Sequence, residues 1–158
     1  MKNLIKTAVI IIVLLIMPAS CIGQAKVFKS VASMTGVESV YIGPAAMRFA
    51  QAASVLDSDK VSADAIKSIK SLEVIDCDEP AYIPAVADEA QKIINELKLD
   101  VILETKEEDE ECTIYGRVPE ENADYIESLL IVSREEDSFS LVYINGKISL
   151  EELLEDYK

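Results

Sequence analysis

The sequence has 158 residues with 15 basic and 29 acidic side chains, a net charge of −14 and no histidine. A surface this acidic repels nucleic-acid phosphates and anionic lipid head groups, so we expect no nucleic-acid partner. The absence of histidine excludes histidine-dependent triads, an imidazole general base and histidine-containing metal sites.

Residues 1–23 have the pattern of an export signal. Lys2 and Lys6 form a basic start, and Ala8–Met17 is an unbroken apolar run. This run is shorter than the roughly 20 residues that a membrane-spanning helix needs. The sequence therefore predicts an exported protein with a signal peptide at 1–23 and a mature part at 24–158.

Two processing routes remain open for this signal. The stretch "PASC" places two small residues before Cys21, as in a lipoprotein signal that ends before Cys21 and leaves that cysteine as the lipidation candidate. Small residues at Cys21 and Gly23, or at Gly23 and Ala25, also suit the ordinary signal peptidase. Ordinary cleavage predicts a periplasmic or secreted protein, whereas lipidation predicts a membrane-anchored lipoprotein.

The first half of the mature part alternates predicted helices and strands. Apolar residues at helical spacing predict a helix over Lys26–Met34, and branched and aromatic residues predict a strand over Val37–Ile42. Pro44 is expected to open a second helix through "AAMRFAQAA". An exposed loop over Asp57–Asp64 and a strand over Ile69–Asp76 follow.

A longer helix and a hairpin are predicted next. Pro84 opens a helix that extends to about Leu97 and has one apolar face. "LDVILET" and "ECTIYGRV" read as strands, with Leu99, Val101 and Leu103 on one side of the first. The acidic "KEEDEE" between them is expected to be a solvated turn.

The last part of the chain predicts two more strands and a closing helix. "YIESLLIVS" and "SFSLVYI" are joined by the charged turn "REED", and the apolar run Leu129–Val132 indicates an interior strand. Asn145-Gly146 is a turn signal, and Ser149 with Glu152 forms a capping box before "LEELLEDY". The element order predicts a single α+β domain with a mainly antiparallel sheet and helices packed on one face.

Cys77 and Cys112 remain as a pair once Cys21 is removed or lipidated, so they are the disulfide candidates in an oxidising compartment. The alternative is that both are ordinary thiols, since free cysteine is often buried as a small apolar residue. Two separated cysteines do not make a tetrahedral metal set. The acidic stretches lack the ligand spacing and glycine of a calcium loop, so we expect no metal site.

No residue pattern predicts a catalytic or cofactor-binding site. Carboxylate pairs arise by chance in a chain this acidic, and neither remaining cysteine has an activating histidine. Arg48 lies on a helix of small apolar residues, and we expect its side chain to point to solvent while its stem covers the helix edge.

Several segments together resemble one protein family. Gly36-Val37, Val40-Tyr41-Ile42, Met47-Arg48 and Thr113-Ile114-Tyr115, with the closing "NGKISLEELLEDY", are similar to the domain-of-unknown-function family 4252, small exported proteins found in Bacteroidota. The resemblance covers nearly all of the mature chain. It implies a fold and an exported location, but it brings no activity or ligand.

These patterns predict an exported cell-envelope protein that is a non-catalytic binding or interaction module. Its expected partner is another envelope protein or a small ligand, with no cofactor, and its only expected membrane contact is a lipid on Cys21. Two alternatives stay open: an enzyme that uses carboxylates or a thiol, and a purely structural lipoprotein.

Overall fold

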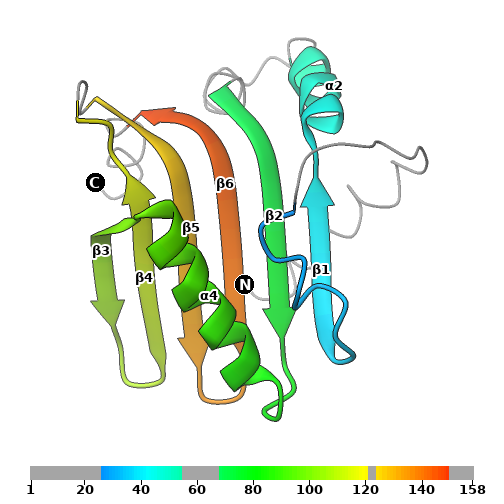
Figure 1. Cartoon of the computed structure of the whole chain (residues 1–158), viewed down its shortest axis with the longest axis vertical. Helices are drawn as coiled ribbons and strands as arrows, with labels where there is room; N and C mark the ends of the chain where they lie inside the picture. Colours follow the sequence, from blue (N-terminus) through cyan, green and yellow to red (C-terminus); the bar gives the residue numbers. More distant parts are fainter. Residues whose placement is uncertain (1–25, 55–67, 121–123, 150–158) are drawn as a thin grey trace.

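The computed structural model describes residues 26–54, 68–120 and 124–149, which form one α+β domain (Figure 1). Its six-stranded sheet has the order β1-β2-β6-β5-β4-β3, and every neighbouring pair is antiparallel. The elements in chain order are β1 (Val37–Ile42), α2 (Pro44–Ser54), β2 (Ile69–Cys77), α4 (Ile83–Leu97), β3 (Asp100–Lys106), β4 (Glu110–Arg117), β5 (Tyr125–Glu135) and β6 (Phe139–Ser149). The predicted α+β fold with an antiparallel sheet is confirmed.

Some predictions fall outside the described residues. These are the signal peptide at 1–23 with Cys21, the loop at 57–64, and the closing helix with its capping residue Glu152. Among the described residues, no helix is both long and apolar enough to cross a membrane.

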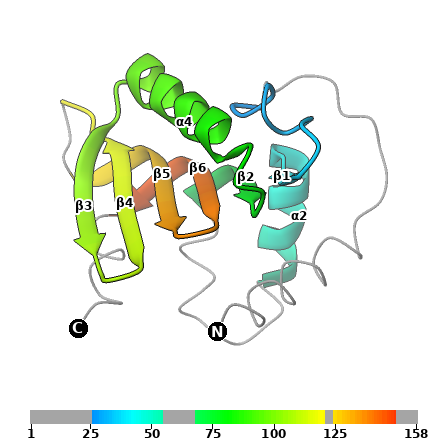
Figure 2. The ribbon, with the colours of Figure 1, turned by 90° about the horizontal axis from the view of Figure 1, so that it is seen from below.

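Helix α4 packs across one face of the sheet (Figures 1 and 2). A proline in its first turn fits the helix start, and Lys98 ends it in a left-handed conformation with φ 52°. Its buried side chains Val86, Ala90, Ile93 and Ile94 meet apolar residues of β2, β5 and β6. The predicted helix and its apolar face are confirmed.

Helix α2 lies at the β1 edge of the sheet (Figure 1). Met47 is its buried contact, and the Gln51 amide donates a hydrogen bond to the carbonyl of Ile69 (3.0 Å). Arg48 is exposed, as predicted, and Phe49 beside it is also exposed.

The predicted helix over Lys26–Met34 is wrong, because this segment consists of turns. Ala32 N–H donates to the Phe28 carbonyl (2.9 Å) and Met34 N–H to the Val31 carbonyl (3.0 Å). A segment of this length is too short to be a stable helix by itself. Phe28 and Val31 are nevertheless buried against the core. The apolar spacing therefore predicts which side chains are buried, but not the conformation of the backbone.

The hairpins β3–β4 and β5–β6 are confirmed, and their acidic turns close where the sequence predicts them. The sequence places Leu99, Val101 and Leu103 on one side of a strand, but in the structure Leu99 is buried whereas Val101 is 56% and Leu103 37% exposed. A register shift between Val101 and Leu103 breaks the alternation. As β3 is an edge strand, this bulge costs little core contact and discourages edge-to-edge pairing.

Strand β5 is an interior strand, as the run Leu129–Val132 predicts. Leu130 belongs to the core under α4, whereas Leu129 belongs to a second apolar cluster with Ile114 and Ile126. Successive side chains of a strand point to opposite faces, so this second cluster lies on the face away from α4.

The predicted turn at Asn145-Gly146 is wrong, because both residues lie within β6. Gly146 pairs with Ile69 where the β2–β6 register shifts. A Cβ at this position would meet the Ser68 carbonyl oxygen and come within 2.8 Å of the Ile69 Cα. The glycine therefore allows close approach of two backbones rather than a chain reversal.

This close approach makes Gly146 a sensitive position. We expect Gly146→Ala to lower the free energy of unfolding by about 1–3 kcal/mol, since backbone atoms have to move to admit the methyl group. Urea denaturation measures the effect. Gly43→Ala is the control, because its Cβ would meet the ring of Tyr41 (3.1 Å), a side chain that can rotate away. Equal losses in the two variants would contradict this assignment.

Candidate functional site

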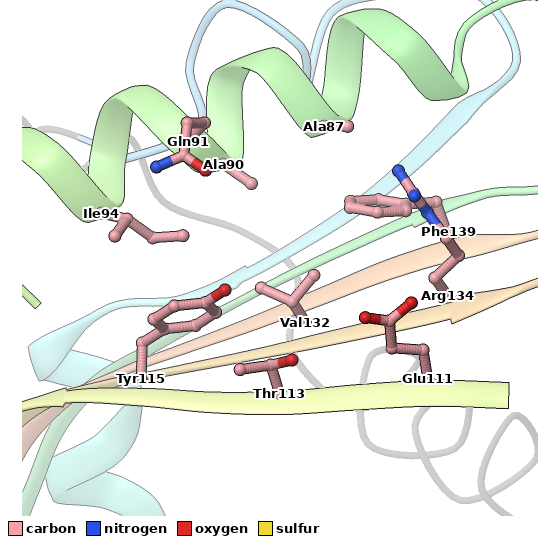
Figure 3. Close-up of a pocket in the computed structure, with 10 residues that line it drawn as sticks. All are labelled: Ala87, Ala90, Gln91, Ile94, Glu111, Thr113, Tyr115, Val132, Arg134 and Phe139. Carbon is pink, nitrogen blue, oxygen red and sulfur yellow. The ribbon is translucent and has the colours of Figure 1, made fainter. Parts of the chain in front are cut away.

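A groove of about 240 Å³ lies between α4 and strands β4 to β6 (Figure 3). The residues that α4 contributes to it are Ala87, Ala90, Gln91 and Ile94. Those from the sheet are Glu111, Thr113, Tyr115, Val132, Arg134 and Phe139.

The sheet register explains why these side chains gather here. Glu111 pairs with Arg134, and Arg134 pairs with Phe139, so three strands contribute to one row. Thr113 and Val132 form the next row on the same face. On the helix side Ala87 and Ala90 are too small to fill the space above these rows, which leaves the groove open.

The groove is apolar at one end and charged at the other. Tyr115 and Ile94 lie at the apolar end, while Glu111 and Arg134 lie beside Phe139 at the other (Figure 3). The Arg134 guanidinium lies 5.4 Å from the centre of the Phe139 ring, within range of a cation–π interaction. Lys106 on the neighbouring strand β3 pairs with Glu111, and its Nζ is 3.9 Å from the Glu111 carboxylate.

The disulfide between Cys77 and Cys112 is not present, and the sheet geometry opposes it. Both cysteines are free thiols. β6 and β5 lie between their strands, so three strand spacings of about 4.8 Å put them about 14 Å apart. A disulfide needs Cα atoms within about 7 Å.

The two thiols also face opposite sides of the sheet. Cys77 belongs to the core beneath α4, where its thiol donates to the Glu79 carbonyl (3.6 Å). Cys112 lies between Glu111 and Thr113, which both line the groove, so its side chain points to the other face. The candidate disulfide is therefore corrected to two separate thiols.

Cys112 is poorly suited to act as a nucleophile. Burial raises the pKa of its thiol, and the negative charge of Glu110 raises it further. Because the thiolate is the reactive form, both effects lower the reactivity of Cys112 at neutral pH. Within the described ranges, no group of three or more acidic, cysteine or histidine side chains is placed to hold a metal ion.

One carboxylate, Glu73 on β2, is 2% exposed. It accepts hydrogen bonds from the backbone N–H groups of Val27 (2.8 Å) and Phe28 (3.2 Å). Burial raises the pKa of Glu73, although the two N–H groups and the nearby Lys26 charge act in the opposite direction. Glu73 lies outside the groove lining, so its role is to anchor the segment 26–34 to the sheet.

A second carboxylate holds the same segment from α4. Glu89 accepts a hydrogen bond from the Ser30 hydroxyl, and Lys92 Nζ lies 3.2 Å from its other oxygen. The Ser30 hydrogen bond lowers the pKa of Glu89, and Lys92 adds to this effect. Neither Glu73 nor Glu89 stands out in the sequence, because acidic residues are abundant and neither occurs in a recognisable motif.

The groove itself leaves no recognisable pattern in the sequence. Its residues come from four elements, and the row Glu111, Arg134 and Phe139 becomes visible once the strand register is known. Alternation along "ECTIYGRV" places Thr113 and Tyr115 on the side opposite Ile114, but alternation alone does not show which side faces a helix.

The model of one protein family matches residues 28–155, and its description is Domain of unknown function (DUF4252). The resemblance seen in the sequence is therefore confirmed at the level of the family. Neither the curated proteins nor the solved structures contain a match.

The raised pKa of Glu73 predicts a pH effect on stability. The folded state binds this proton more tightly than the unfolded state, whose pKa is close to the ordinary value of 4.5. The quantity to follow is the free energy of unfolding of the wild type minus that of Glu73→Gln. We expect this difference to fall as pH rises from below 4.5 through the raised pKa. Urea denaturation at a series of pH values measures this difference.

Glu38→Gln, which alters an exposed carboxylate on β1, is the control for the Glu73 experiment. Its difference curve should lack the fall seen with Glu73→Gln. A wild-type minus Glu73→Gln difference that stays flat or rises with pH would show that burial does not dominate at Glu73.

The cysteine geometry predicts that reduction does not change the protein's mass. Intact mass spectrometry of the purified protein, alkylated while unfolded, should show both Cys77 and Cys112 modified without any reductant. Alkylation of the folded protein should leave Cys77 unmodified, because it is completely buried. A gain of two hydrogens on reduction would overturn the assignment of separate thiols.

Proposed function

The chain belongs to the family described as Domain of unknown function (DUF4252), and on that premise we propose that it is a non-catalytic binding module of the cell envelope. The groove between α4 and β4 to β6 is its binding site. The bound group is a segment of another envelope protein.

The lining of the groove is the observation that carries this proposal. Tyr115, Val132 and Phe139 offer apolar contact area, and Glu111 with Arg134 can orient a ligand through hydrogen bonds. This combination of an apolar floor and a few polar groups is typical of binding sites.

The size of the groove favours a protein segment over a free small molecule. Sites for small ligands usually enclose about 300–1,000 Å³, and this groove of about 240 Å³ is open to solvent. It has room for one or two side chains of a partner whose backbone stays outside.

The cell-envelope location rests on the predicted signal at residues 1–23. An exported, non-catalytic domain with an open groove fits a protein that acts on a neighbour in the same compartment. Both processing routes at Cys21 are compatible with this function.

The groove can be tested by blocking it from the exposed side of α4. Gln91 lines the groove but is exposed, so Gln91→Trp should cover it without disturbing the core. Peptides selected from a random library on the purified protein should lose at least about tenfold in affinity for this variant, about 1.4 kcal/mol. Fluorescence anisotropy measures the dissociation constants.

Ala85→Trp is the matched control for this experiment. Ala85 is an exposed residue on the same helix and lies outside the groove lining, and its replacement leaves the net charge unchanged. Peptide affinity for Ala85→Trp should equal that for the wild type. If no peptide is selected, or if both variants bind alike, the groove is not the binding site.

A further inference from the structure

Two acidic turns lie at the same end of the sheet. The β3–β4 and β5–β6 hairpins point the same way, because β4 and β5 pair with Glu110 opposite Glu135 (Figure 1). The exposed acidic residues of these two turns are Glu107, Glu108, Asp109, Glu136 and Asp137. Cys77 at the end of β2 pairs with Phe139 at the start of β6, so the exposed Asp78 and Glu79 that follow Cys77 add to this end.

The charged end of the groove opens at these turns. Glu111 and Arg134 line the groove, and the next row of the register is Glu110 with Glu135. Successive residues of a strand are about 3.3 Å apart, so the acidic turns begin within one or two residues of the groove. A segment lying in the groove would therefore extend past them.

Among the described residues, the cations at this end do not balance the acidic side chains. Lys106 lies beside Glu111, and Arg134 lies over the Phe139 ring. The exposed carboxylates of the turns outnumber these two cations. At about 0.1 M salt their field extends about 10 Å, far enough to reach a ligand at the mouth of the groove.

We propose that the occupant of this groove is a basic peptide segment that carries an apolar anchor. The anchor side chain packs between α4 and the floor formed by Val132 and Phe139. Lysine or arginine side chains next to it pair with the acidic turns. This inference rests on the proposed function, to which it adds the chemistry of the partner.

The exposed edge of β3 is a less suitable surface for the same partner. A peptide could in principle add a strand there, but the bulge between Val101 and Leu103 interrupts the ladder. The apolar anchor and the charge complementarity both belong to the groove, which lies on the face of the sheet rather than at its edge.

The test uses three synthetic peptides with the same apolar residues and with lysine, glutamine or glutamate at all polar positions. We expect the purified protein to bind the lysine peptide at least about tenfold tighter than the glutamate peptide, since several exposed charge pairs contribute a few tenths of a kcal/mol each. This preference should shrink as salt rises from about 0.1 M to about 1 M, where the screening length falls to about 3 Å.

A variant of the β3–β4 turn tests whether the preference for the lysine peptide arises beside the groove. E107Q/E108Q/D109N removes three exposed charges from the β3–β4 turn and should weaken binding of the lysine peptide by about tenfold. Binding of the glutamine peptide should stay unchanged. The control is the triple variant D88N/E96Q/D100N. It removes two exposed charges from the outer side of α4 and one from the far end of β3, so its net charge changes as much as that of the turn variant.

The outcomes separate this inference from the proposed function. If all three peptides bind equally and Gln91→Trp weakens them all, the groove is a binding site but its partner is not basic. If the turn variant and its control weaken the lysine peptide equally, the attraction comes from net charge alone and the inference fails. If Gln91→Trp leaves binding of every peptide unchanged, the proposed function fails as well.

Discussion

One helix is too narrow to cover this sheet, and the rest of the structure follows from that mismatch. A helix with its side chains is about 10–12 Å wide, whereas six strands about 4.8 Å apart span about 24 Å. α4 therefore covers a diagonal band (Figure 1) and leaves a flank on either side (Figure 2). The segment 26–34 closes the β1–β2 flank, where it buries Phe28 and Val31. The flank over β4 stays open as the groove.

The closed flank depends on a buried charge rather than on regular structure. A segment made of turns has backbone N–H groups that no helix or sheet satisfies, and burying them without partners costs about 1–3 kcal/mol each. The Glu73 carboxylate accepts two of them, and Glu89 on α4 binds the Ser30 hydroxyl in the same segment. The desolvation that raises the pKa of Glu73 is the cost of this arrangement, and the burial of Phe28 offsets it.

The sequence predicts the parts of this fold that rest on local periodicity and turn chemistry. α4, the interior position of β5 and both acidic hairpin turns follow from apolar spacing and charge. The turn predicted at Asn145-Gly146 is wrong, because the same dipeptide suits both a tight turn and a strand whose neighbour approaches closely. The position of Val101 could not be predicted from alternation, because a bulge in an edge strand is set by strand pairing rather than by composition. Glu73 could not be found, since an acidic residue in an amphipathic strand is normally placed toward water.

The division of the sheet into a closed and an open flank also bears on how an exported chain would meet a partner. The segment 26–34 lies on the β1–β2 side of α4 (Figure 2). The groove is lined by α4 and by strands β4 to β6, on the other side. Attachment through residues before Lys26 would hold the domain by its closed flank. Anionic lipid head groups would repel the acidic turns, so a lipid-anchored chain would orient them away from the bilayer. The groove would then face the compartment and remain accessible to a basic segment, and cleavage without lipid would leave it equally open.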